Sequence, residues 1–99
     1  MSFLGLIEIQ LHFPANASLK GKRKELASVK AQLQRRFGAA VAETDHHELW
    51  QRAELTAALV SREAGELRHR AEAVDRYVRS MFPDDVSVEI HIKSKKDLL

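Results

Sequence analysis

The chain has no cysteine, and only two prolines and four glycines among its 99 residues. The absence of cysteine excludes disulfide bonds, a thiolate nucleophile and a cysteine-ligated zinc site, and it fits a cytoplasmic location. Long apolar runs are missing too. The first one, MSFLGLIEIQLHF, is interrupted by Glu8 and Gln10, far short of the ~20 residues of a membrane span, and has no basic leader before it. We therefore expect a strand there, and no membrane partner.

The remaining composition is that of a folded globular protein, with 44% apolar and 30% charged residues. A chain of this length has room for one hydrophobic core. We expect a single domain over residues 1–93. Residues 94–99 show no periodic pattern and are expected to form a mobile tail.

Alternation of apolar and polar residues, or a short apolar run, predicts strands over residues 3–13, 39–45, 53–61 and 86–93. A helix is expected from Leu19, with Ser18 as its N-cap and Gly38 as its C-cap. Its apolar stripe is Leu26, Val29, Leu33 and Phe37. A second helix is expected from about Ala64 to Pro83, with the stripe Leu67, Ala71, Val74, Val78 and Phe82.

The element order is thus β-α-β-β-α-β. In a chain of this size, that order predicts an α+β, ferredoxin-like sandwich: a four-stranded antiparallel sheet with both helices on one face and with the first and third strands at its centre. Acylphosphatases share this topology, but PANASLKGKRK lacks the phosphate loop ending in Phe-Arg that they need. The chain also has no nucleophile elbow, Walker loop or HExxH motif. We expect a protein that is not an enzyme and uses no cofactor.

Charge is distributed unevenly along the chain. Residues 19–37 contain seven basic side chains and one acid, whereas residues 39–66 contain six acids and two arginines. On a helical wheel, Lys20, Lys24 and Arg35 lie opposite the apolar stripe, and Arg23 and Lys30 flank it. The helix start adds partial positive charge, so phosphate is expected there with Lys20, Lys22 and Arg23 around it. The alternative is a solvated helix face without a partner.

The expected open face of the sheet has no aromatic residue on which RNA bases could stack. Its residues are mostly acidic or neutral: Glu8, Gln10, His12, Glu54, Thr56, Glu89 and His91. RNA is therefore expected along the first helix and near Trp50. His12 and His91 are expected to be neighbours on paired strands. Leu6, Ala58 and Val60 on the same face make a homodimer the alternative use of this surface.

The segment TDHHELWQRAEL, residues 44–55, gathers residues that suit three roles. Asp45, His46, His47 and Glu48 are metal-ligand types, but adjacent histidines in a turn diverge, so no metal site is expected. Trp50 could stack on a base while Arg52 and His46 reach phosphate. The role that we predict is structural: Leu49 and Trp50 fold back over the end of the core, and Asp45 accepts hydrogen bonds from local amides.

Two motifs carry a resemblance to a known family. SLKGKRKEL at 18–26 and VAETDHHELWQRAEL at 41–55 resemble the YlxP-like family of small bacterial proteins over nearly the whole chain. The resemblance implies a ferredoxin-like fold and, because genes of the family often lie beside those for transcription and translation factors, an RNA or ribosome-associated partner. It implies no biochemical activity. Where the family commonly has Glu, this chain has Gly21, so a capping box with Ser18 is incomplete.

The sequence therefore predicts a cytoplasmic domain that binds RNA or a ribonucleoprotein through its first helix. The expected contacts are Lys20, Lys22, Arg23, Lys24, Arg35 and Arg52, with His46 and Trp50 as loop contacts. The alternative is a structural or regulatory module that acts by open-sheet dimerisation or through a protein partner.

Overall fold

The computed structural model describes residues 1–14 and 18–98. Its elements, in chain order, are β1 (Phe3–His12), α1 (Leu19–Phe37), β2 (Ala40–Asp45), β3 (Arg52–Ser61), α2 (Ala64–Met81), β4 (Val86–Ser94) and the 3₁₀ turn η1 (Lys95–Leu98). Every predicted helix and strand is present, and the bounds differ from the predicted ones by only a residue or so.

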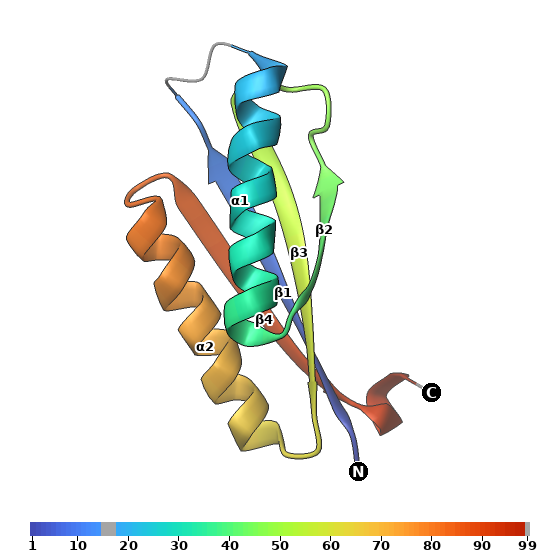
Figure 1. Ribbon diagram of the computed structural model, residues 1–99. Coiled ribbons are helices and arrows are strands. Elements are labelled where there is room, and N and C mark those ends of the chain that lie inside the picture. Colours follow the sequence, from blue (N-terminus) through green and yellow to red (C-terminus); the bar gives the residue numbers. More distant parts are fainter. Residues whose placement is uncertain (15–17, 99) are drawn as a thin grey trace.

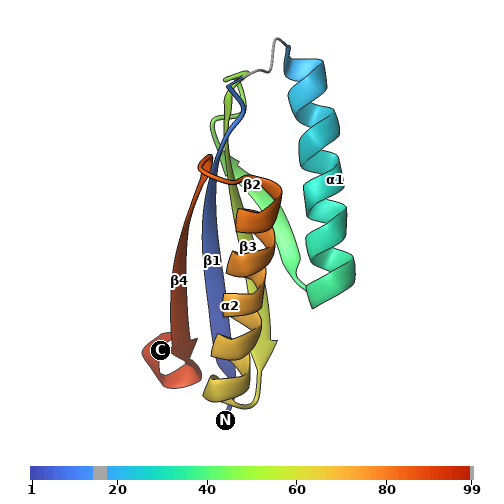
Figure 2. The ribbon, with the colours of Figure 1, turned by 90° about the vertical axis from the view of Figure 1, so that its left-hand side faces the viewer.

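The four strands form one sheet in the order β2-β3-β1-β4, and each neighbouring pair is antiparallel. β1 and β3 therefore lie at the centre, as predicted (Figure 1). Figure 2 shows the sheet nearly edge-on, with α1 and α2 on the same side of it. The arrangement confirms the ferredoxin-like sandwich and leaves the opposite face of the sheet uncovered by helices.

The boundaries of α1 follow from its cap residues. The Ser18 hydroxyl accepts a hydrogen bond from the Gly21 amide at 3.0 Å, which satisfies one donor of the first turn. At the other end Gly38 adopts a left-handed conformation, with φ of 65°, and donates its amide to the Gln34 carbonyl. A side chain would be strained at that φ, so glycine ends the helix at this point.

The core lies between the helices and the inner face of the sheet. Alternate residues of the two central strands are buried, and they face the buried stripes of α1 and α2. The stripes consist of Leu26, Val29 and Leu33 in α1 and Leu67, Ala71, Val74 and Val78 in α2. Phe37 and Phe82, which were predicted to complete the stripes, are only partly buried.

Regular structure extends further toward the C-terminus than the sequence indicated. Within the segment expected to be a mobile tail, Ser94 still belongs to β4 and residues 95–98 form η1. The Asp97 carboxylate accepts a hydrogen bond from the Ser94 amide at 2.8 Å, and the Lys95 amide donates to the Ser2 carbonyl at 3.0 Å. The first bond stabilises the turn, and the second holds it against the first residues of the chain. Leu99 lies outside the described residues.

Candidate functional site

The two sequence motifs that stand out, one at the start of α1 and one between β2 and β3, come together at one end of the molecule (Figure 1). Lys22 joins them. Its ammonium group donates hydrogen bonds to the carbonyls of His46, at 2.5 Å, and Leu49, at 2.7 Å. It also lies 3.3 Å from a carboxylate oxygen of Glu43, and the Lys22 side chain has no exposed area. We call this arrangement the Lys22 clamp.

The clamp corrects the prediction that Lys22 contacts nucleic acid. Its charged end is directed inward to Glu43 and to two loop carbonyls, so it is not part of the exposed basic surface. The physical reason is its position in the helix, four residues before Leu26 and thus on the buried stripe of α1. A buried ammonium group requires a counter-ion and hydrogen-bond acceptors, and β2 and the loop supply both.

Glu43 is the acidic partner of the clamp and was not among the predicted site residues. Its carboxylate is only 7% exposed and is paired with Lys22, with the Arg23 guanidinium and, at 3.7 Å, with the His47 ring. Burial alone would raise the pKa of Glu43, but hydrogen bonds from Arg23 and Lys22, together with their positive charges, lower it below its usual 4.5. Glu43 is therefore ionised in the folded protein at neutral pH.

The lowered pKa predicts an acid-dependent loss of stability. Because the pKa of Glu43 is lower in the folded than in the unfolded chain, its contribution to stability is present above pH 4.5 and is lost as pH falls through the folded-state value. Urea unfolding should give the parent a larger free energy of unfolding than Glu43→Gln at pH 7. The difference in this free energy between the two proteins should decrease below pH 4.5. A difference that stays constant down to pH 3 would contradict this account.

The loop after β2 turns sharply at His46, whose φ is 65°. Asp45 stabilises the turn by accepting a hydrogen bond from the His46 amide at 2.7 Å, which confirms the predicted role of Asp45. Among the described residues, the four metal-ligand types of this segment do not converge into a group of three or more donors.

Leu49 and Trp50 do not cover the end of the core. Their side chains are 46% and 53% exposed, so the prediction that Trp50 is a buried structural residue is wrong. The Lys22 clamp explains the difference, because the backbone carbonyls of the loop, rather than the rings and alkyl groups, face inward. Trp50 and Arg52 instead line a hollow of about 370 Å³, together with Leu49 and Gln51.

The basic residues predicted to contact nucleic acid lie on different parts of the surface. Lys20 and Lys24 are exposed on the first turns of α1, but each is two residues from Lys22 and thus lies about 200° around the helix from the clamp. Arg23 is half-exposed and holds Glu43 and the His47 carbonyl. Arg35 is in the last turn of α1, about 22 Å along the axis from Lys20. Arg35 is therefore not part of the same surface.

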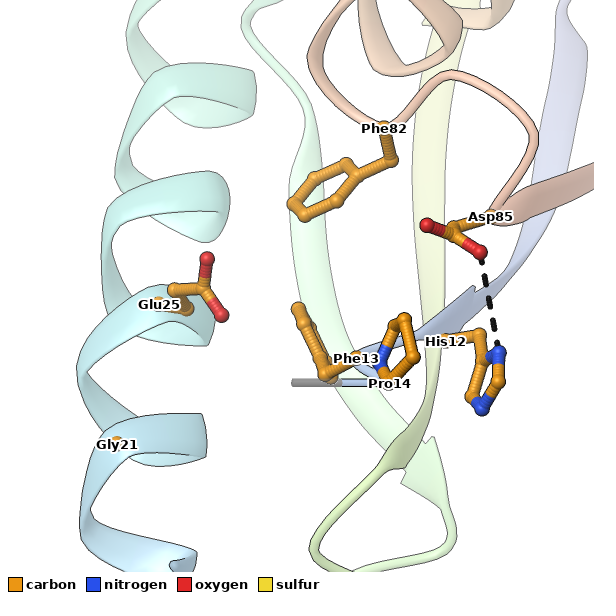
Figure 3. Close-up of a pocket in the computed structure, with 7 residues that line it drawn as sticks. All are labelled: His12, Phe13, Pro14, Gly21, Glu25, Phe82 and Asp85. Carbon is orange, nitrogen blue, oxygen red and sulfur yellow. Dashed lines mark ion pairs between the residues drawn. The ribbon is translucent and has the colours of Figure 1, made fainter. Parts of the chain in front are cut away.

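A larger cavity, of about 510 Å³, lies between the start of α1 and the ends of β1 and α2 (Figure 3). Phe13 and Phe82 form its apolar wall, with ring centroids 5.7 Å apart and nearly perpendicular planes. Glu25 and Asp85 bring carboxylates to it, and Asp85 lies 3.8 Å from the His12 ring. The sequence did not indicate this cavity, because its walls come from segments far apart in the chain. Its acidic lining disfavours phosphate.

His12 and His91 are not neighbours, contrary to the prediction. In the β1–β4 register, His91 lies opposite Leu6, six residues and so about 20 Å from His12. The His12 amide instead donates to the Asp85 carbonyl at 2.9 Å. This separation depends on the register between two strands that are distant in sequence. The local pattern predicted only that the two histidines lie on the same face of the sheet.

Comparison with solved structures agrees with the fold. The chain is similar to the de novo designed protein Foldit4, with 11% identity, a TM-score of 0.62, and 96% and 99% of the two chains covered. It also matches the de novo designed protein Ferredog-Diesel, with 19% identity, a TM-score of 0.43, and 92% and 84% covered. No curated protein matches. Within the described residues no helix is both long and apolar enough to cross a membrane.

A family model does match the sequence. It is described as a protein of unknown function (DUF503), and it spans residues 4–91, which include both motifs, both helices, β2 and β3, and all but the end residues of β1 and β4. The chain therefore belongs to the DUF503 family.

Proposed function

We propose that this protein is a non-enzymatic, cytoplasmic, bacterial domain that binds RNA, free or within a ribonucleoprotein, at the end formed by the β2–β3 loop and the start of α1. The observation that carries the proposal is the exposure of Trp50 beside Arg52 on a loop held by the Lys22 clamp. The resemblance to the YlxP-like family implies an RNA or ribosome-associated partner. It favours the same location, because the clamp joins the two motifs that carry the resemblance at this end of the molecule.

Stacking on Trp50 is the central contact of the proposed interface. Base–aromatic stacking needs an open ring face on a fixed support, and it tolerates any base sequence. The two hydrogen bonds from Lys22 fix the backbone on both sides of His47 and Glu48, immediately before the ring. Arg52, at the first position of β3, is exposed and lines the same hollow as Trp50, so it would meet a phosphate of the stacked nucleotide.

Lys20 and Lys24 extend the interface over the helix. They lie on the far side of α1 from the clamp, so a strand that stacks on Trp50 reaches them only by passing over the first turns of α1. The exposed acids Asp45 and Glu48 lower the positive potential of the loop itself. We therefore assign to Lys20 and Lys24 the phosphate contacts that position the strand, and to Trp50 the contact that orders a base.

The lysines can be tested by salt-dependent titration with a short single-stranded RNA of mixed sequence. Each lysine that neutralises a phosphate adds about 0.7 to the log–log salt slope, so Lys20→Ala/Lys24→Ala should lower the slope by about 1.4. The matched control is Arg68→Ala/Arg76→Ala, which removes two exposed charges from α2 and should leave the slope almost unchanged. Equal slopes for the parent and the lysine variant would remove α1 from the interface.

The second candidate function is assembly through the uncovered face of the sheet. Val60 is 69% exposed there, and Leu4, Leu6 and Ala58 surround it in the β1–β3 register. A homodimer would bury these side chains. Solution mass separates the candidates, because a dimer that is indifferent to RNA and is broken by Val60→Lys supports this second function.

A further inference from the structure

The uncovered face of the sheet carries a group of metal-ligating side chains that has no role in the proposed RNA interface. Glu8 of β1 lies directly opposite Glu89 of β4, and His91 follows on the same face, opposite Leu6. One carboxylate oxygen from each glutamate and one ring nitrogen of His91 all lie within 4.8 Å of one another. Among the described residues this is the one group of three such donors that converges.

The two carboxylates face each other without a compensating cation. Like charges directly opposite on paired strands destabilise the pair. Within the described part of the chain neither Glu8 nor Glu89 forms an ion pair, and Lys93, two residues beyond His91 on the same face, pairs with neither of them. The sheet thus holds two negative groups together at a cost that a bound cation would offset.

A neighbouring polar atom is also left without a partner. Gln10 is two residues beyond Glu8 and on the same face, and its side-chain oxygen is buried without a hydrogen-bond partner. Its amide nitrogen donates to Glu54, on the side away from β4. A water molecule held by a cation would supply the donor that this oxygen lacks.

We propose that Glu8, Glu89 and His91 bind a divalent first-row transition-metal ion of the zinc type. An imidazole nitrogen with two carboxylates suits such ions, whereas Ca²⁺ and Mg²⁺ prefer oxygen ligands alone. Zinc ligands lie about 2.0–2.2 Å from the ion in a tetrahedral arrangement, so two of them are at most about 3.6 Å apart. Glu8 is half-buried and Glu89 and His91 are exposed, so their side chains are free to rotate, which would bring the three donors within that limit and leave the open side for water.

The site is formed by side chains on an exposed face, so folding does not depend on the ion. This separates it from structural zinc sites, in which the metal holds the domain together. Glu8 alternates with the buried residues of β1, so the group lies on the face of the sheet away from the helices, which Figure 2 shows to be uncovered. The clamp is formed instead by Lys22 of α1 and the loop after β2. Metal binding and RNA binding should therefore be lost independently when their own residues are changed.

Calorimetric titration of the full, metal-free chain with Zn²⁺ tests the proposal. We expect one ion per chain, with Glu8→Gln, Glu89→Gln and His91→Ala each lowering the affinity at least about tenfold while the far-UV spectrum stays that of the parent. The control His46→Ala/His47→Ala removes the adjacent histidines of the loop and should bind Zn²⁺ as the parent does. The proposal is overturned by a parent without saturable binding, or by loss of binding in the control and not in the sheet variants.

Discussion

Lys22→Met should lower the free energy of unfolding by about 3–5 kcal/mol, because it removes one partner of a buried ion pair and leaves the other behind. Methionine keeps most of the apolar stem, so the decrease reports the ammonium group rather than a cavity. The carbonyls of His46 and Leu49 lose their donor, and Glu43 keeps only Arg23 and the His47 ring. The melting temperature should fall by at least about 12 °C.

The matched control for this variant is Lys24→Met. Lys24 is exposed on the same helix two residues away, and substitutions at such positions usually change stability by less than about 0.5 kcal/mol. Thermal and urea unfolding of both variants give the comparison. If Lys22→Met melts within a degree or two of Lys24→Met, the clamp contributes nothing and the loop is held by other interactions.

Trp50→Ala should weaken the binding of single-stranded RNA by about 1–3 kcal/mol, or about 5- to 150-fold, because it removes the stacking surface. Stability should change far less than the about 3–5 kcal/mol that removal of a buried tryptophan costs, since the ring is 53% exposed. Val60→Ala, which shortens an exposed apolar side chain on the sheet face, is the control and should bind RNA as the parent does.

An opposite pattern would exclude the proposed role of Trp50. If Trp50→Ala unfolds much more easily than the parent but binds RNA with unchanged affinity, the indole ring supports the loop and touches no base. Measuring affinity and stability on the same two preparations distinguishes these results directly.

Local periodicity was sufficient to predict the fold. The alternation in β1 and the three- and four-residue spacing in α1 each correspond to buried positions, and Ser18 and Gly38 mark the ends of the first helix as expected. These signals depend on neighbours in sequence, and each element was long enough to show its period clearly. The antiparallel order then followed from the rules of chain connection.

The Lys22 clamp was missed although the sequence contains a signal for it. Lys22 continues the Leu26, Val29, Leu33 stripe backward by four residues, and Glu43 falls on the same side of β2 as Val41. A lysine and a glutamate that both fall on inward positions are candidates for a buried pair. The prediction grouped Lys22 with the basic residues at the helix start, although its place on the helical wheel is on the apolar stripe.

The exposure of Trp50 and the separation of His12 from His91 had no comparable signal. The first depends on which groups of an irregular loop face inward, and the clamp decides that by binding two backbone carbonyls. The second depends on the register of β1 against β4, strands that are far apart in the chain. The same register brings Glu8 opposite Glu89. The group of metal-ligating side chains on the sheet face therefore could not be predicted without the strand pairing.

The emission of Trp50 during titration with single-stranded RNA tests the central claim most directly. It is the sole tryptophan of the chain, so the signal reports this ring and nothing else. Base stacking on Trp50 predicts a saturable change in emission that added salt reverses. Emission that stays constant while fluorescence anisotropy of labelled RNA shows binding, or the absence of any binding at low salt, would contradict the proposed interface.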